Sequence, residues 1–330
     1  MISAEFSRTT EPKIYIIHEN DAWVVPLHRA LDDLRLPYAD LFVDEGLVDF
    51  SREPPPGVYY NRMSASSHTR DHRYAIELTD VLLAWLEEHG RRVVNGRASL
   101  ALERSKIAQY AALARFDIPT PLTRAAVGNE AILTAARSFD GPFVIKPNRG
   151  GKGLGVTLYR NIKALAAALA AGELPHPIDG VTLIQQFIPA ATPTITRMEF
   201  IGGDFFYAVR VDTSAGFELC PADVCAPDAA VCATPQSATT RFAIIPEFRH
   251  PLVEGCRAFL SAYGAQIAGI EFIEDAQGRP FVYDVNFNTN YNADAEAASP
   301  RRGMDGIAAY LGAELATLTL SKRARMIGVR

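Results

Sequence analysis

The sequence predicts an α/β protein of two or three compact lobes, with a parallel sheet near its N-terminus. Three observations support this fold class. Strand and helix patterns alternate through roughly the first hundred residues, which is typical of a parallel sheet covered by helices. Pairs of neighbouring strands with glycine turns follow in the rest of the chain. The length of 330 residues also suits several lobes around a sizeable core.

The N-terminal elements follow from their apolar patterns. Short runs rich in β-branched and aromatic residues predict four strands, at 13–20, 38–43, 58–60 and 91–96. Helical patterns lie between them at 26–36 and 77–90, and Gly90 is a suitable residue to end the second helix. A proline-rich loop precedes the third strand.

A single long helix is expected over 99–118, with Ser99 as its N-cap and Pro119 after its end. The remaining strands are expected at 143–147, 156–160, 182–188, 197–203 and 205–213, followed by two strands within 267–290 that turn at Gln277 and Gly278. The remaining helices are expected at 161–174, 245–264 and 306–318, with a basic tail after the last.

Composition excludes several classes of function. The formal charge of −5 gives no net attraction to nucleic acid or to an anionic membrane. The first residues are polar and no apolar segment approaches the ~18 residues of a membrane span, so we expect a cytoplasmic protein. The cysteines lack paired CxxC spacing, which favours small buried side chains over zinc, although zinc is an alternative; they are Cys220, Cys225, Cys232 and Cys256.

The segment FVIKPNRGGKGLGV is the most informative motif. Its glycines are Gly150, Gly151, Gly153 and Gly155, and they allow successive backbone N–H groups to point at one phosphate. Lys146 ends the preceding strand, where its ammonium could reach the same anion. The alternative is a flexible glycine hairpin with a solvated lysine.

Polar residues alternate with apolar ones in GIEFIEDAQGRPFVYDVNFN. Asp284 and Asn286 are two residues apart and therefore project to the same face of a strand, near Glu271 on the strand before. Two carboxylates and an amide oxygen are hard ligands that suit Mg²⁺. The alternative is a solvated acidic face, which the apolar neighbours of Asp284 disfavour.

Two arginines are further candidates. Arg210 is expected on an inner strand, where it either meets a transferring phosphoryl group or forms a structural ion pair, for example with Glu199 or Glu218. Arg62 follows a predicted strand of the first lobe, where it either binds a substrate carboxylate or belongs to a solvated basic loop.

In this order, these motifs resemble the ATP-grasp superfamily, and within it the enzymes similar to ribosomal-protein glutamate ligase and glutathione synthetase. The resemblance implies an ATP-grasp fold with an N-terminal parallel-sheet pre-ATP-grasp domain, divided at 1–97, 98–187 and 188–330. It implies nucleotide contacts from Lys106, Lys146, the four glycines and the hinge residues Gln185, Gln186, Phe187 and Ile188. Arg210 matches the γ-phosphate arginine, and the metal ligands fall on Glu271, Asp284 and Asn286.

The chain departs from this family pattern at two places. The branch often has an acidic residue two before an arginine, but here Ile195 stands two before Arg197, which leaves the ribose contacts open; Arg197 is a candidate substrate-binding residue. The metal asparagine is commonly followed by a run ending in Pro-Gly, which here is replaced by a segment that contains Asn288. That segment lines the acceptor-substrate site in the family.

The resemblance implies an ATP-dependent ligase that needs Mg²⁺ or Mn²⁺. It would join a small-molecule carboxylate to an amine through an acyl phosphate, releasing ADP and phosphate. The substrates would be amino acids or a peptide, with no nucleic acid or membrane partner, and a homo-oligomer is possible. The alternatives are an ATP-grasp phosphotransferase that forms no amide and a nucleotide-binding regulator without turnover.

Overall fold

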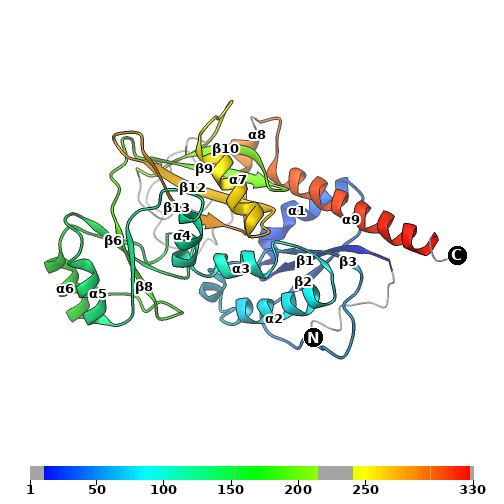
Figure 1. Ribbon diagram of the computed structural model, residues 1–330, viewed down its shortest axis with the longest axis horizontal. Coiled ribbons are helices and arrows are strands. Elements are labelled where there is room, and N and C mark those ends of the chain that lie inside the picture. Colours follow the sequence, from blue (N-terminus) through cyan, green and yellow to red (C-terminus); the bar gives the residue numbers. More distant parts are fainter. Residues whose placement is uncertain (1–10, 152, 215–240, 298, 328–330) are drawn as a thin grey trace.

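The computed structural model describes residues 11–151, 153–214, 241–297 and 299–327, which form three sheets with helices packed against them (Figure 1). The first sheet carries the N-terminal strands, the second lies at the opposite end of the molecule, and the third lies between them. Among the described residues, no helix is long and apolar enough to cross a membrane.

The first sheet is parallel, as the alternation of strands and helices predicts. Its order is β2-β1-β3-β4, with β1 Lys13–His18, β2 Tyr38–Phe42, β3 Gly57–Asn61 and β4 Arg92–Val94. Helix α2 (Ala75–Glu88) packs on one face of the sheet. Helix α1 (Asp21–Asp33) and the C-terminal helix α9 (Gly303–Ile327) cover the other face. Helix α1 begins before the predicted range because Asn20 caps it, accepting a hydrogen bond from the Trp23 N–H at 3.3 Å.

The second sheet is antiparallel and carries the glycine loop. Its order is β5-β8-β6-β7, with β5 Thr123–Ala126, β6 Phe143–Pro147, β7 Thr157–Tyr159 and β8 Thr182–Gln186. Helices α5 (Asn129–Ala136) and α6 (Ile162–Ala171) share its hydrophobic core. Strand β5 and helix α5 were not among the predicted elements.

The third sheet is antiparallel, in the order β11-β10-β9-β12-β13. Its strands are β9 Thr194–Ile201, β10 Asp204–Asp212, β11 Phe242–Ile245, β12 Ile267–Glu274 and β13 Pro280–Asn286. Helix α7 (Leu252–Ala262) shares a core with one face, to which β9 contributes Met198 and Phe200. Alternate residues of β9 face the opposite side, where the candidate site lies. Helix α7 begins later than predicted because β11 ends at Ile245 and the chain then turns, with a positive φ of 50° at Glu247.

The predicted long helix over 99–118 is wrong, because the chain forms two helices there. Helix α3 (Arg97–Glu103) ends before Ser105, whose φ of −147° and ψ of 106° are extended. Helix α4 (Lys106–Ala114) then begins, capped by the Ser105 hydroxyl, which accepts from the Ala108 N–H at 3.3 Å. The break places Lys106 in the first turn of a helix that packs against β13.

Asn148, which follows β6, also caps helix α4. Its side-chain oxygen accepts from the Ile107 N–H at 3.0 Å and from the Ser105 hydroxyl at 3.2 Å. Its backbone oxygen accepts from the Lys106 N–H at 3.1 Å. The first N–H groups of a helix have no partners within the helix, so these contacts satisfy donors that would otherwise be buried without one. They also fix the start of the glycine loop to the start of α4.

We therefore expect Asn148→Ala to lower the free energy of unfolding by about 2–3 kcal/mol, because the side chain accepts two hydrogen bonds in a buried joint. Asn161→Ala is the matched control, since Asn161 caps helix α6 at an exposed position. The control should lose about 1 kcal/mol. Denaturant titration of both variants measures the difference, and an equal loss would contradict the role of Asn148 as a joint between lobes.

Candidate active site

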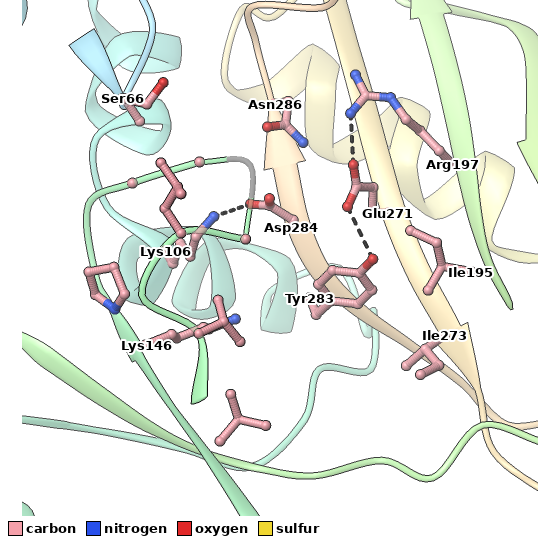
Figure 2. A pocket seen from close by; sticks show the side chains of 18 of the residues that line it. Ser66, Lys106, Lys146, Ile195, Arg197, Glu271, Ile273, Tyr283, Asp284 and Asn286 are labelled. Carbon is pink, nitrogen blue, oxygen red and sulfur yellow. Dashed lines mark hydrogen bonds and ion pairs between the residues drawn. The ribbon is translucent and has the colours of Figure 1, made fainter. Parts of the chain in front are cut away.

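One large pocket lies where the three sheets approach one another (Figure 2). The glycine loop borders it on one side and the strands β12 and β13 on the other, and a loop of the first lobe that includes Ser66 completes it. Most of the residues predicted from the sequence line this pocket: Lys106, Lys146, Gly150, Gly151, Gly153, Gln185, Gln186, Phe187, Ile188, Arg197, Glu271, Asp284, Asn286 and Asn288.

Two lysines lie on the same side of the pocket. Lys146, at the end of β6, is 5% exposed and donates a hydrogen bond to the Tyr110 hydroxyl at 2.7 Å. Burial, followed by the repulsion of Lys106, lowers the pKa of Lys146 to about 7. The Lys106 ammonium forms an ion pair with Asp284. The Lys146 ammonium is buried and donates to a neutral hydroxyl, which fits the binding of an anion that would supply a counter-charge.

The glycine loop connects β6 to β7 and forms a concave edge of the pocket. Gly153 and Gly155 have φ angles of 73° and 72°, a backbone conformation that residues with a side chain rarely adopt. A Cβ at Gly150 would lie 3.3 Å from the Pro147 ring, so the loop also packs tightly on the end of β6. Of the four glycines, Gly155 alone is absent from the described pocket lining; it lies beside Pro147 and Pro175. The loop thus suits the close approach of phosphate oxygens.

The carboxylates lie on two adjacent strands. Glu271 on β12 is directly opposite Asp284 on β13, and a register shift beside this pair accommodates Tyr283 as an extra residue. Because of the bulge, Tyr283, Asp284 and Asn286 all line the pocket, while Val282 and Val285 are in the core.

The oxygens of Glu271 and Asp284 have protein partners in this structure. Glu271 accepts from Arg197 at 2.8 Å and from the Tyr283 hydroxyl at 3.1 Å, and Asp284 pairs with Lys106. No group of three His, Cys, Asp or Glu side chains in the described parts of the chain is arranged to hold a metal ion. Asn286 is therefore needed to complete a set, and the three hard oxygen donors in one pocket wall fit Mg²⁺.

The segment predicted as the hinge, residues 185–188, starts within the last residues of β8 and lines the pocket. Gln185 is buried and donates to the Thr123 hydroxyl at 2.8 Å, which fixes its amide. Gln186, Phe187 and Ile188 continue along the pocket wall. A half-buried aromatic ring with a buried aliphatic side chain beside it offers an apolar surface for a flat heterocycle such as adenine.

Arg197 lies in the pocket between two carboxylates. Its guanidinium donates to Glu199 at 2.5 Å and to Glu271 at 2.8 Å. Nearby Gly269 has no side chain, and a Cβ there would overlap the guanidinium. The glycine therefore leaves room for Arg197 to reach across β12 to Glu271.

Arg210 does not line the pocket, contrary to the prediction. Strand β10 directs Val209 and Val211 toward the side of the candidate site, so the side chain of Arg210 projects to the opposite face, where it is exposed. Arg210 lies on an inner strand, as predicted, but on the wrong face. Its suggested partner Glu199 pairs with Arg197 instead, and Glu218 lies outside the described residues.

Arg62 also differs from its predicted role as a ligand of substrate. It is 1% exposed, and its guanidinium donates to the Thr289 carbonyl at 3.0 Å and to the Asn290 side chain at 2.9 Å. It reaches the Asn288 side chain at 3.3 Å. Arg62 therefore holds the segment 288–290 in place, and Asn288 and Asn290 line the pocket.

Several pocket residues were not predicted. Glu103 accepts from the N–H groups of Ala65 and Phe287, at 3.1 and 2.8 Å, and so joins the first lobe to the end of β13. Burial raises the pKa of Glu103 to about 7. Ser66 and Tyr283 also line the pocket. Nothing in the local sequence distinguishes Glu103 or Ser66. Tyr283 is adjacent to Asp284, and it reaches the pocket because of a bulge that simple strand alternation does not predict.

Cys256 is the one cysteine among the described residues, and it does not line the pocket. Cys256 is buried in helix α7, and burial raises the pKa of its thiol to about 12. Cys220, Cys225 and Cys232 lie outside the described residues.

The lowered pKa of Lys146 generates a prediction about nucleotide binding. The charged groups that face it are Lys106, Glu271 and Asp284, and the Tyr110 and Tyr283 rings lie beside it. Since a phosphate stabilises the ammonium, binding should take up a proton above the free pKa of about 7. We expect the affinity for MgATP to fall by up to about tenfold per unit between about pH 7 and pH 9, as measured by calorimetry.

Lys146→Arg is the control, because a guanidinium stays charged throughout this range. Any slope that remains in this variant belongs to other groups, of which the carboxyl of Glu103, with a pKa of about 7, is the first candidate. Equal slopes in wild type and variant would contradict the assignment to Lys146.

Comparison with solved structures identifies the fold. No sequence-family profile matches the chain, and no curated protein matches it. It is similar in structure to a RimK domain ATP-grasp protein from Sphaerobacter thermophilus, with 21% identity, 90% of this chain and 99% of that chain covered, and a TM-score of 0.59. The ATP-grasp ligase PsnB, solved with a precursor peptide and AMPPNP, has 17% identity, coverage of 94% and 99%, and a TM-score of 0.62. D-alanyl-alanine synthetase A from Vibrio cholerae has 12% identity, coverage of 93% and 99%, and a TM-score of 0.62. The chain therefore has the ATP-grasp fold.

Proposed function

We propose that this protein is an ATP- and Mg²⁺-dependent ligase that joins a carboxylate to an amine. In the first step, a carboxylate oxygen of the substrate attacks the γ-phosphorus of ATP, and the bond to the ADP oxygen breaks. The product is an acyl phosphate. In the second step, the amine attacks the acyl carbon, phosphate leaves, and the nitrogen loses a proton to give an amide.

The observation that carries this proposal is one pocket with two oppositely charged walls. Lys106, Lys146 and the glycine loop supply cations and N–H groups, and Glu271, Asp284 and Asn286 supply hard oxygen ligands. Phosphoryl transfer needs this combination, because catalysis depends on positioning and on charge stabilisation rather than on a protein nucleophile. The structural neighbours support the coarser assignment, since they include proteins described as a ligase and a synthetase.

The ion pair between Lys106 and Asp284 joins the two walls of the pocket. A triphosphate would take Lys106 as a partner, and Asp284 would then be free to bind metal with Glu271 and Asn286. Mg²⁺ held by these residues would supply positive charge against the charge that develops on the transferred phosphoryl group. Burial would make each of these interactions stronger than it is in water.

Arg197 is better placed than Arg210 to meet charge on the transferred group. It lines the pocket, it is buried, and Glu271 holds its guanidinium toward the proposed metal site. We assign to Arg197 the stabilising role that the sequence pattern assigned to Arg210. This exchange changes the expected behaviour of the two variants.

The direct test is hydroxamate formation from ATP, hydroxylamine and a panel of amino acids and peptides, with ADP release measured in parallel. We expect wild type to form a hydroxamate with at least one carboxylate, and Asp284→Asn to lower kcat by about 10²–10³-fold because a metal ligand is weakened. Asp80→Asn is the matched control, because Asp80 lies on helix α2 and forms an ion pair with Arg97 of helix α3. ADP release without trapped product would favour a phosphotransferase, and nucleotide binding without turnover would favour a regulator.

In the same assay, Arg210→Ala should keep kcat within about twofold of wild type, as for a surface substitution away from the site. Arg197→Lys should lower kcat by about 10²-fold, because an ammonium cannot replace a planar fork of donors. A large loss in Arg210→Ala would instead restore the role predicted from the sequence, and would require the strand to present Arg210 to the ligand.

A further inference from the structure

A second, small cavity lies beside the main pocket. The two share the residues Arg197, Val211, Phe242 and Asn290, so Arg197 lies at the boundary between them. Strands β9, β10 and β11 form most of its wall, and the segment 290–296 closes it. The sequence motifs did not point to this cavity.

Glu199 is the most unusual group in this cavity. It lies two residues after Arg197 on β9, so both side chains project to the same face of the sheet. Glu199 is 1% exposed, and one of its oxygens accepts from Arg197 at 2.5 Å. The other oxygen is buried and has no hydrogen-bond partner among the described residues. A buried carboxylate oxygen without a donor is costly, so the cavity lacks a donor that a ligand could provide.

The charges around the cavity also call for a cation. Glu296 lines it and accepts from the Tyr207 hydroxyl at 2.5 Å. Arg197 is the one cationic side chain in its described lining, and Glu271 shares that guanidinium. The described lining therefore holds two carboxylates, Glu199 and Glu296, and one guanidinium, which also pairs with Glu271 outside the lining. Burial raises the pKa of Glu199 although Arg197 lies beside it, and burial also raises the pKa of Glu296.

Aromatic rings complete the cavity. Tyr207 and Tyr291 both line it, and their rings meet edge to face with centroids 6.1 Å apart. The faces of such rings attract small cations, and the effect is larger where water is excluded. An ammonium group brings both a positive charge and several N–H donors, whereas a metal ion would need more oxygen ligands than one unpaired carboxylate oxygen provides.

We propose that this cavity is a subsite for a primary ammonium group of a substrate, with the unpaired oxygen of Glu199 as its principal acceptor. The proposal rests on the proposed ligase function, because the cavity opens beside the residues that would hold the acyl phosphate. Two sources of the ammonium are possible: the amine that is joined, or an amino group on the carboxylate substrate. In either case the substrate carries a cationic amine.

Titration with methylammonium chloride, followed by ligand-observed NMR, tests the subsite without any need for turnover. We expect saturable binding to wild type that is weakened about tenfold or more in Glu199→Gln, because a charged acceptor is replaced by an amide. Glutamine keeps an oxygen for Arg197, so the variant should fold, and its thermal unfolding checks this. Glu296→Gln should give a smaller loss of affinity.

Two controls make the result specific. Methanol is similar in size to methylammonium but uncharged, and it should not compete. The Glu314→Gln variant should bind methylammonium as wild type does, because Glu314 lies on helix α9, where it pairs with Arg92 of β4. Failure of wild type to bind methylammonium, or equal binding to folded Glu199→Gln, would overturn the proposal. Equal occupancy by methanol would make the cavity a polar niche without preference for a cation.

A kinetic measurement then identifies the source of the ammonium. Hydroxylamine is neutral at the assay pH and can replace the amine in the second step. If the amine occupies the subsite, Glu199→Gln raises the KM of the amine about tenfold more than that of hydroxylamine. If the amino group belongs to the carboxylate substrate, the KM of the carboxylate rises in both reactions. A wild type that forms neither product would contradict the ligase function, while the methylammonium titration would still decide the subsite.

Discussion

The site depends on contacts that a single residue, Asn148, makes between the glycine loop and helix α4. Asn148 begins the glycine loop, and it caps helix α4 with both its side-chain and its backbone oxygen. Through this joint, the loop that would hold phosphate and the helix that carries Lys106 have one fixed relation. The same asparagine donates to Asp179 at 2.6 Å, which ties it to the turn before β8 as well. The hydrogen bond from Lys146 to the Tyr110 hydroxyl of helix α4 is a second link between the two lysines.

The second constraint is the amount of charge that the pocket buries. Lys146 carries a lowered pKa, and Arg197 is divided between Glu199 and Glu271. Ion pairs of this kind contribute little net stability, because desolvation offsets most of the attraction. Their arrangement is better explained by the proposed ligands: phosphate would bind the two lysines, and a metal ion would bind Asp284. On this view the unpaired oxygen of Glu199 belongs to the same scheme, as an acceptor for a cationic substrate group.

Much of the fold could be predicted from the sequence because its signals are local. Alternating apolar runs predict the parallel first sheet, and Asp284 and Asn286 share a strand face because of their spacing. The failures have tertiary causes. The helix break at Ser105 depends on a cap from Asn148, which is distant in sequence, and apolar periodicity continues across the break. The alternation of β10 places Arg210 on one face, but only packing decides which face meets the pocket. Arg62 looked like a ligand of substrate because its acceptors lie over two hundred residues away.

A crystal structure with AMPPNP and Mg²⁺ would test the central claim most directly. The account predicts the terminal phosphates within hydrogen-bond distance of Lys106 and Lys146, with the ion pair between Lys106 and Asp284 broken. It predicts Mg²⁺ bound by Asp284 and Asn286, with Glu271 beside it. A nucleotide bound elsewhere, or one bound here while Lys106 and Asp284 stay paired and the metal takes other ligands, would contradict it.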